Sequence, residues 1–218
     1  LLQRTRCFYF YDPAVPCNKR QPGSGCSAIS GFNRIMAILG TSPDCIASHP
    51  SDMAVAMRAL DATVETIAAD GARRSLTLDM LYRLPGDTPH IENALEPGEL
   101  ITGVKLPPAP KGRQMYRKVR DRASYAFALV SVAGILAVAN GRIRYAALAF
   151  GGIGTMPWRN REAESMLLDS TVDTDLFERV ADKILADARG YGANDFKIPL
   201  LRRTLIACLS SLAREDAL

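Results

Sequence analysis

Apolar and polar residues in the first half of the chain follow two different periods. Apolar residues at helical spacing predict a helix over residues 52–60, which Ser51 or Asp52 can cap. Strict alternation predicts strands over residues 63–68, 74–78 and 99–107. A turn joins the first two strands into a hairpin, and a short helix is expected after them, over residues 79–84.

The second half predicts three strands followed by helices. Residues 113–120 form the first strand, whereas the continuous apolar run over residues 125–138 fits either a helix or a buried strand. The pair Asn140-Gly141 favours a strand, because it is the strongest signal for a two-residue hairpin and an alternating segment follows it. The later helices are expected over residues 161–168, 173–188 and 198–214. The predicted fold class is therefore α+β, with a three-stranded antiparallel sheet packed under helices.

A proline-rich stretch, residues 107–112, divides the two halves. Three prolines and a glycine fall within these six positions, which is typical of a connection between domains. We expect a first domain over residues 1–108 and a second over residues 109–218.

Residues 6–46 show neither period and carry four of the five cysteines. Cys7, Cys17, Cys26 and Cys45 are separated mainly by turn-forming prolines and glycines. A loop of this length needs a stabilising cross-link or a function, since little else in its sequence would hold it together. The fifth cysteine, Cys208, falls on the apolar face of the last predicted helix and is expected in the core.

Three kinds of cross-link could form between four cysteines. Two disulfides are one option, but the cysteine count does not choose their pairing. Zinc is another, although no pair has the short Cys-x2-4-Cys spacing of structural zinc sites. A [4Fe–4S] cluster needs four converging thiolates, and Arg6, Lys19 and Arg20 would offset its negative charge. The spacing matches no ferredoxin pattern, so the residues alone leave all three options open.

The composition is ordinary for a globular protein and argues against some classes. Hydrophobic residues make up 48% and charged residues 23% of the 218 positions, with a net charge of +4. Basic residues are interleaved with acidic ones and form no basic stripe with aromatics, which argues against nucleic-acid binding. No signal segment and no apolar run of membrane-spanning length is present. Because the chain starts at Leu1, in what looks like the middle of a strand or loop, we expect an N-terminal portion to be missing.

Seven stretches carry a family resemblance that extends over the whole chain. They are residues 1–7 (LLQRTRC), 16–20 (PCNKR), 22–26 (PGSGC), 49–54 (HPSDMA), 97–101 (PGELI), 116–118 (YRK) and 150–152 (FGG). Through them the chain resembles the FAD-binding medium subunit of the molybdenum hydroxylases, the family of xanthine dehydrogenase and carbon monoxide dehydrogenase. More narrowly, it is similar to the iron–sulfur flavoprotein subunits of bacterial periplasmic aldehyde oxidoreductases.

The resemblance implies cofactors, partners and an activity. Members with this four-cysteine insertion hold a [4Fe–4S] cluster, so Cys7, Cys17, Cys26 and Cys45 would be its ligands. FAD is the other implied cofactor, and the implied partners are a molybdenum-cofactor subunit and a [2Fe–2S] subunit. The chain would be the remainder of a bipartite FAD-binding domain with a cysteine-rich insertion, followed by a C-terminal α+β domain. Its activity would be that of an oxidoreductase subunit, passing electrons from the partners through FAD to an external acceptor.

The resemblance also implies residues near the flavin. Asp52 would hydrogen-bond the cofactor, although an aspartate at a helix start is more commonly a plain N-cap. Ile101, with Leu100 beside it, would contact the isoalloxazine edge, and Leu2 would touch FAD as well. Lys118 would stabilise negative charge on the reduced flavin, where residue type alone suggests a solvated strand lysine. Two glycine-rich phosphate-binding stretches of the family are absent from this sequence.

A function from a different class is also open. A zinc- or disulfide-stapled loop could display a partner-binding surface without redox chemistry. The sequence contains no recognisable catalytic dyad or nucleophile motif, which is consistent with both functions. The resemblance implies export to the periplasm with a partner, whereas free thiols would suit the cytoplasm equally.

Overall fold

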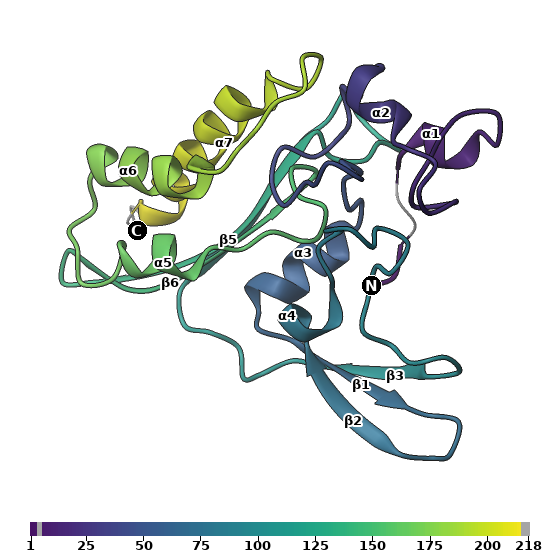
Figure 1. The fold of residues 1–218 in the computed structure, drawn as a ribbon. Coiled ribbons are helices and arrows are strands. Elements are labelled where there is room, and N and C mark those ends of the chain that lie inside the picture. The colour runs from purple at the N-terminus through teal and green to yellow at the C-terminus, as the bar shows by residue number, and fades with distance from the viewer. Residues whose placement is uncertain (4–5, 215–218) are drawn as a thin grey trace.

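The computed structural model describes residues 1–3 and 6–214. Within these residues it contains two antiparallel sheets of three strands each, in the orders β2-β1-β3 and β4-β5-β6. Figure 1 shows the first sheet at the bottom of the molecule and the second running through its middle, with helix α3 between them. The α+β fold class predicted from the sequence is confirmed.

The first half of the chain forms a small sheet with its own core. Its elements are α3 (Asp52–Ala59), β1 (Thr63–Ile67), β2 (Arg73–Thr77), α4 (Leu78–Leu81) and β3 (Leu100–Lys105). β1 is the central strand, and Val64 packs with Leu76 and Leu81 in a core that α3 and α4 complete. β3 ends before the proline-rich connection, since proline has no N–H to donate to a neighbouring strand.

The second half forms the larger sheet and the main core. Its elements are β4 (Arg113–Val119), β5 (Val130–Ala139), β6 (Arg142–Gly151), α5 (Arg161–Ser165), α6 (Thr174–Leu185) and α7 (Lys197–Ala213). On one face of β5, Val132 and Leu136 belong to the core that α6 and α7 cover. On the opposite face, Ala133 packs against Val55 and Ala59 of α3. The central strand is thus buried on both faces, which explains why its apolar run is continuous rather than alternating.

Several boundaries differ from the sequence prediction. The strand expected from residue 125 begins only at Val130, because Tyr125 has a left-handed backbone (φ 50°) that a strand cannot contain. Arg122 holds this turn by donating from Nε to the Tyr125 carbonyl oxygen over 3.1 Å. Helix α5 ends at Ser165 and α6 at Leu185, each three residues before its predicted end. The division at residues 108 and 109 stays a prediction.

The cysteine segment, residues 6–46, is more ordered than its sequence suggests. It contains two single-turn helices, α1 (Phe8–Tyr11) and α2 (Ser27–Ser30), which were not predicted. The expectation that little else holds this segment is wrong for its second part, because the Ile38 and Leu39 N–H groups both donate to the Ile153 carbonyl oxygen. Ile38 and Leu39 are also members of the main core.

No helix in the described part of the chain combines the length and the apolar character needed to cross a membrane.

Candidate functional site

The four cysteines of residues 6–46 line one small cavity. Cys7, Cys17, Cys26 and Cys45 all contribute to its wall. Cys17, Cys26 and Cys45 are free thiols, and Cys26 alone of the four is partly exposed. Cys7 immediately precedes α1 and Cys26 immediately precedes α2. The fold therefore gathers the four residues that the sequence singled out as candidate ligands.

A tight turn places Cys17 beside Cys26. The two residues form an antiparallel bridge, and the Asn18 N–H donates to the Gly25 carbonyl oxygen over 2.7 Å. Gly23 and Gly25 adopt left-handed backbones, with φ of 81° and 102°, which residues with a side chain rarely adopt. The glycines between these cysteines thus serve the turn itself.

Asn18 links this turn to Cys45, and sequence reasoning did not single it out. Its side chain is buried and donates from Nδ2 to the carbonyl and the carboxylate of Asp44, over 3.2 and 3.0 Å. Its Oδ1 accepts from the Gly25 N–H over 2.7 Å. The only signal for Asn18 was its place in the PCNKR stretch, because its partner Asp44 is 26 residues away.

Burial keeps the thiols of Cys7 and Cys45 protonated. It raises the pKa of Cys7 to about 11, although the N–H groups of Phe10 and Tyr9 oppose this shift. Burial also raises the pKa of Cys45, and the nearby Lys19 ammonium opposes it. A metal centre here would have to displace these protons, as thiolate ligands require.

The three basic residues expected around the cysteines have different roles. Lys19 donates to Glu92 over 2.7 Å and lies close enough to lower the pKa of Cys45. Arg20 donates to the carbonyl oxygens of Tyr9 and Phe10, and Arg6 donates to Ala128. Of the three, Lys19 is therefore the residue whose charge acts on a cysteine most clearly.

The arrangement of the four thiols differs from that of a structural zinc site. Within residues 1–3 and 6–214, no group of three or more His, Cys, Asp or Glu side chains is placed to hold a single metal ion. A zinc ion would need its sulfur ligands about 2.3 Å from one point. The thiols stand instead around the wall of a cavity.

A second cluster forms where α3 meets the larger sheet. Lys118 of β4 donates to Asp52 Oδ2 over 2.6 Å, and Tyr116 of the same strand donates to Asp52 Oδ1 over 2.8 Å. Asp52 is free to do this because Ser51 is the N-cap and accepts from the Ala54 N–H. The interpretation of Asp52 as a plain N-cap is therefore wrong.

Tyr116 was quoted in the family motif but was not predicted as a site residue. Its hydroxyl lies 2.8 Å from Asp52 Oδ1 and 3.0 Å from Ser131 Oγ. With one proton to give, it donates to the carboxylate and accepts from the serine. Burial, together with the Asp52 carboxylate, raises the pKa of Tyr116. The phenol consequently stays protonated and fixes the orientation of Asp52.

The other predicted flavin contacts lie on different elements. Leu100, at the start of β3, is 66% exposed, whereas Ile101 beside it is partly buried against the core of the first sheet. Leu2 is 44% exposed and lines a pocket together with His49. The structure thus joins Asp52 and Lys118 directly, and it places Leu100 and Leu2 on accessible surface.

The pocket at Leu2 adjoins the cysteine cavity. Lys19, Cys45 and Ala47 line both spaces. His49 lies in the pocket wall with its ring centroid 5.0 Å from that of Tyr82, and burial lowers the pKa of His49 to about 4. His49 is therefore neutral at physiological pH.

Comparisons with known proteins match both halves of the chain. The model described as "FAD binding domain in molybdopterin dehydrogenase" matches residues 29–109, and "CO dehydrogenase flavoprotein C-terminal domain" matches residues 114–207. The chain is 54% identical over 218 residues, all of its length, to the aldehyde oxidoreductase FAD-binding subunit PaoB of Escherichia coli (strain K12). Both halves of the chain are thus similar to the FAD-binding medium subunits of the molybdenum hydroxylases. The chain covers 65% of the length of PaoB.

Two further proteins are similar to this chain, the first in sequence and the second in fold. The glyceraldehyde dehydrogenase medium chain of Sulfolobus acidocaldarius is 32% identical over 138 residues, which are 63% of this chain and 47% of that relative. The reconstituted CO dehydrogenase from Oligotropha carboxidovorans shares the fold with a TM-score of 0.64 at 21% identity, over 74% of this chain and 56% of that chain. The chain thus spans less than two thirds of the relatives it matches.

These similarities confirm the broader resemblance seen in the sequence. The names of these relatives mention FAD or a medium chain and no iron–sulfur cluster. The narrower description, an iron–sulfur flavoprotein, therefore stays a prediction.

Proposed function

We propose that this chain acts in the FAD-binding, electron-transfer subunit of a molybdenum-dependent aldehyde or xanthine-type oxidoreductase. The observation that carries the proposal is the contact of Asp52 with Lys118 and Tyr116, at 2.6 and 2.8 Å. It joins the two matched domains at the residues where the resemblance implies FAD. The 54% identity to an FAD-binding subunit supports the same function.

The residues of this cluster would bind and tune the flavin. FAD, when bound, accepts electrons and delivers them to an external acceptor. Asp52 would accept a hydrogen bond from a cofactor hydroxyl, while Tyr116 and Lys118 hold its carboxylate in place. The Lys118 ammonium is 20% exposed and would favour the reduced, negatively charged ring. Ile101, Leu100 and Leu2 would supply the apolar and backbone contacts.

The cysteine cavity would hold a [4Fe–4S] cluster. Such a cluster relays single electrons and binds four thiolates around a volume rather than at one point. Cys7, Cys17, Cys26 and Cys45 line one cavity, and N–H groups of α1 point at Cys7. These observations support a common site for the four thiols. The wall shared with the pocket at Leu2 makes Cys45 the ligand nearest a route toward the flavin.

The proposed function requires partners. Oxidation at a molybdenum centre on one subunit would deliver electrons through a [2Fe–2S] subunit to the flavin here. The chain presents no catalytic acid–base pair of its own in this proposal, and its contribution is to position the cofactors and to set their potentials.

The test is the cofactor content of the full subunit, prepared anaerobically in its complex. We expect bound FAD and about four irons per chain. Cys26→Ser should lower the iron content to below about one per chain while FAD remains. Cys208→Ser is the matched control, because Cys208 is a buried cysteine of α7 away from the cavity, and it should retain both cofactors. Asp52→Asn should weaken FAD binding about tenfold and leave the iron unchanged.

The opposite results discriminate between the two functions. Zinc in place of iron, with no FAD, would contradict the redox proposal and support the stapled partner-binding module. Iron that survives Cys26→Ser in full would contradict the assigned ligands.

A further inference from the structure

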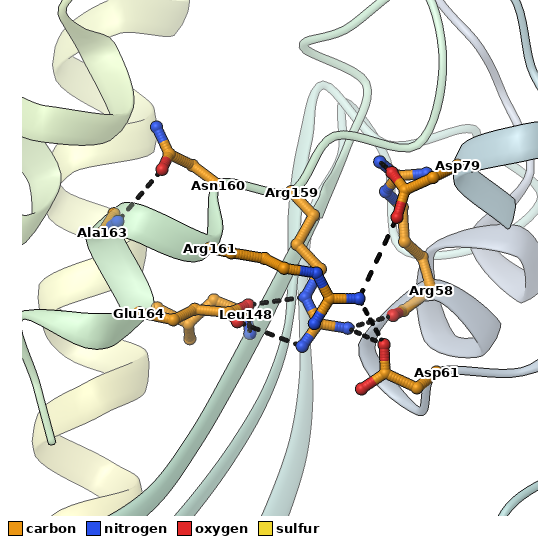
Figure 2. Close-up of polar contacts among 9 residues, drawn as sticks. All are labelled: Arg58, Asp61, Asp79, Leu148, Arg159, Asn160, Arg161, Ala163 and Glu164. Atoms are coloured by element: carbon orange, nitrogen blue, oxygen red, sulfur yellow. Dashed lines mark hydrogen bonds and ion pairs between the residues drawn. The ribbon is translucent and has the colours of Figure 1, made fainter. Parts of the chain in front are cut away.

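A buried arginine holds the end of α3 that lies opposite Asp52. Arg159, in the segment between β6 and α5, donates from Nη1 to the Arg58 carbonyl oxygen over 2.6 Å and to Asp61 Oδ1 over 2.8 Å (Figure 2). Its side chain is only 3% exposed. Arg58 and Asp61 belong to the matched FAD-binding domain, and Arg159 belongs to the matched C-terminal domain. The contact therefore joins the two domains.

The other side of the Arg159 guanidinium is fixed to the larger sheet. Nε and Nη2 donate to the two carboxylate oxygens of Glu164 in α5, over 2.7 and 3.0 Å. Glu164 Oε1 also accepts from the backbone N–H of Leu148 in β6 over 2.7 Å. A two-point pair of this kind fixes orientation as well as distance. Arg159 is therefore a rigid link from β6 to the C-terminal end of α3.

The helix between this link and Asp52 is short and packed tightly. α3 has eight residues, which span about 12 Å. Val55 and Ala59 lie against Ala133 and Ala149 of the sheet. A Cβ added at Gly151 would lie 2.8 Å from Val55 Cγ2, so the helix has almost no gap beneath it. A displacement of one end of α3 must then reach the other end, because a rigid helix moves as a unit.

We propose that Arg159 is a positioning residue for the flavin site. By holding the Arg58 carbonyl and Asp61 against Glu164, it sets the place of Asp52 relative to Lys118 and Tyr116. The inference rests on the proposed function, because it assumes that FAD binds beside Asp52. Arg159 itself lies at the far end of α3 and acts through that helix.

Arg161 provides the matched control. It is an arginine two residues away that also donates to Asp61 Oδ1, over 2.7 Å. Its side chain is 59% exposed, and its ion pairs are with Asp61 and, at 3.9 Å, Asp79. It carries the same charge and shares a partner with Arg159, but it does not bridge to Glu164 in the network of Figure 2.

The experiment compares Arg159→Lys with Arg161→Lys in the full FAD-loaded subunit within its complex. A lysine cannot make the two-point pair with Glu164 and also reach the Arg58 carbonyl. We expect Arg159→Lys to weaken FAD binding about tenfold and to shift the flavin midpoint potential, and Arg161→Lys to change the dissociation constant less than about twofold. Thermal unfolding is followed in parallel. A lower unfolding temperature with unchanged FAD affinity and potential would show a purely structural role and overturn the proposal.

A double mutant separates this inference from the function on which it rests. If Arg159 acts through Asp52, then Asp52→Asn with Arg159→Lys should bind FAD no more weakly than Asp52→Asn alone. Fully additive losses would overturn the inference. If Asp52→Asn alone leaves FAD binding unchanged, the proposed flavin site itself is wrong.

A second variant covers the case in which Arg159→Lys fails to fold. Asp61→Asn removes one carboxylate partner of Arg159, and asparagine tolerates the left-handed backbone of this position (φ 54°). It should weaken FAD binding more than Arg161→Lys does. Both variants weaken the contact between positions 61 and 161, but only Asp61→Asn also weakens a contact of Arg159. Equal effects of the two variants would contradict the proposal.

Discussion

Lys197 shows how one residue ties distant parts of this molecule together. Its fully buried ammonium donates to the Met36 carbonyl oxygen over 2.8 Å and to the Gly152 carbonyl oxygen over 2.7 Å. Asn194, three residues earlier in the chain, donates to the Ala37 carbonyl oxygen over 3.1 Å. One side chain at the start of α7 therefore holds the cysteine segment and the end of β6 together.

Burial of Lys197 should make stability depend on pH. Burial, with help from the charges of Arg6 and Arg34 and opposition from Asp121, lowers the pKa of Lys197 from its usual 10.5 to about 7. Between pH 7 and 10.5 the unfolded chain holds a proton that the folded chain has lost, so this group makes stability rise with pH there. Below pH 7 the cost of burying the charge is present in full.

Lys197→Met should remove this dependence. Between pH 7 and 10 the free energy of unfolding of the wild type should rise, relative to the variant, by about 1.4 kcal/mol per pH unit. Chemical denaturation at several pH values measures the difference. Lys183→Met, at an exposed lysine paired with Glu162, should leave the slope in this window unchanged. Parallel curves for the wild type and Lys197→Met would contradict the prediction.

Some single residues could be predicted from the sequence and others could not. Asp52 and Lys118 were expected at the site through the family resemblance, and they form an ion pair. Lys197 gave no signal, because its acceptors Met36 and Gly152 lie 161 and 45 residues away. A local pattern cannot contain a contact whose partner is so distant in sequence.

At the scale of elements, the strand pattern of the larger sheet was predictable because turn chemistry identifies it. Asn140 and Gly141 both have left-handed backbones, with φ of 52° and 70°, as the two-residue hairpin requires. The single-turn helices α1 and α2 were not predictable, since four residues cannot show a helical period. They follow Cys7 and Cys26 and depend on the packing of the cysteine segment.

Two glycines that flank β6 separate the cost of backbone conformation from the cost of a steric clash. Gly141 and Gly152 have similar left-handed backbones, with φ of 70° and 74°. A Cβ at Gly141 meets nothing within 4 Å, whereas one at Gly152 would lie 2.6 Å from the Leu129 carbonyl oxygen. Gly141→Ala should cost about 1 kcal/mol of the free energy of unfolding, for the backbone alone.

Gly152→Ala should cost more, about 3 kcal/mol or above, because the clash is with backbone atoms that cannot turn aside. Urea denaturation of the two variants measures both costs. Equal losses would show that backbone conformation alone explains the need for glycine at position 152.

At the scale of the molecule, the cysteine segment is attached in two independent ways. In residues 7–31, around the thiols, Arg20 donates to Tyr9 and Phe10, Asn18 donates to Asp44 beside Cys45, and Lys19 donates to Glu92. Residues 33–39 are held by the C-terminal domain instead, since Asn33 donates to the Tyr191 carbonyl oxygen and the Ile38 N–H donates to the Ile153 carbonyl oxygen. No local pattern indicates this division, because it depends on the tertiary contacts of the second part.

This division predicts what removal of the proposed cluster would do. Without iron, the first part keeps a cavity between its thiols that nothing fills, so it should open more often. Hydrogen exchange should therefore speed up by about tenfold or more at amides in residues 7–31, since local opening governs their protection. The Ile38 and Leu39 amides should keep their protection, because their acceptor, the Ile153 carbonyl oxygen, lies in the main core.

Mass spectrometry of the iron-loaded and chelator-treated subunit measures both regions, with peptides of β5 as an internal control. Equal acceleration in both regions would mean that the thiols hold the whole segment, as its sequence first suggested, and no change in either would mean that the fold of this segment is independent of any metal.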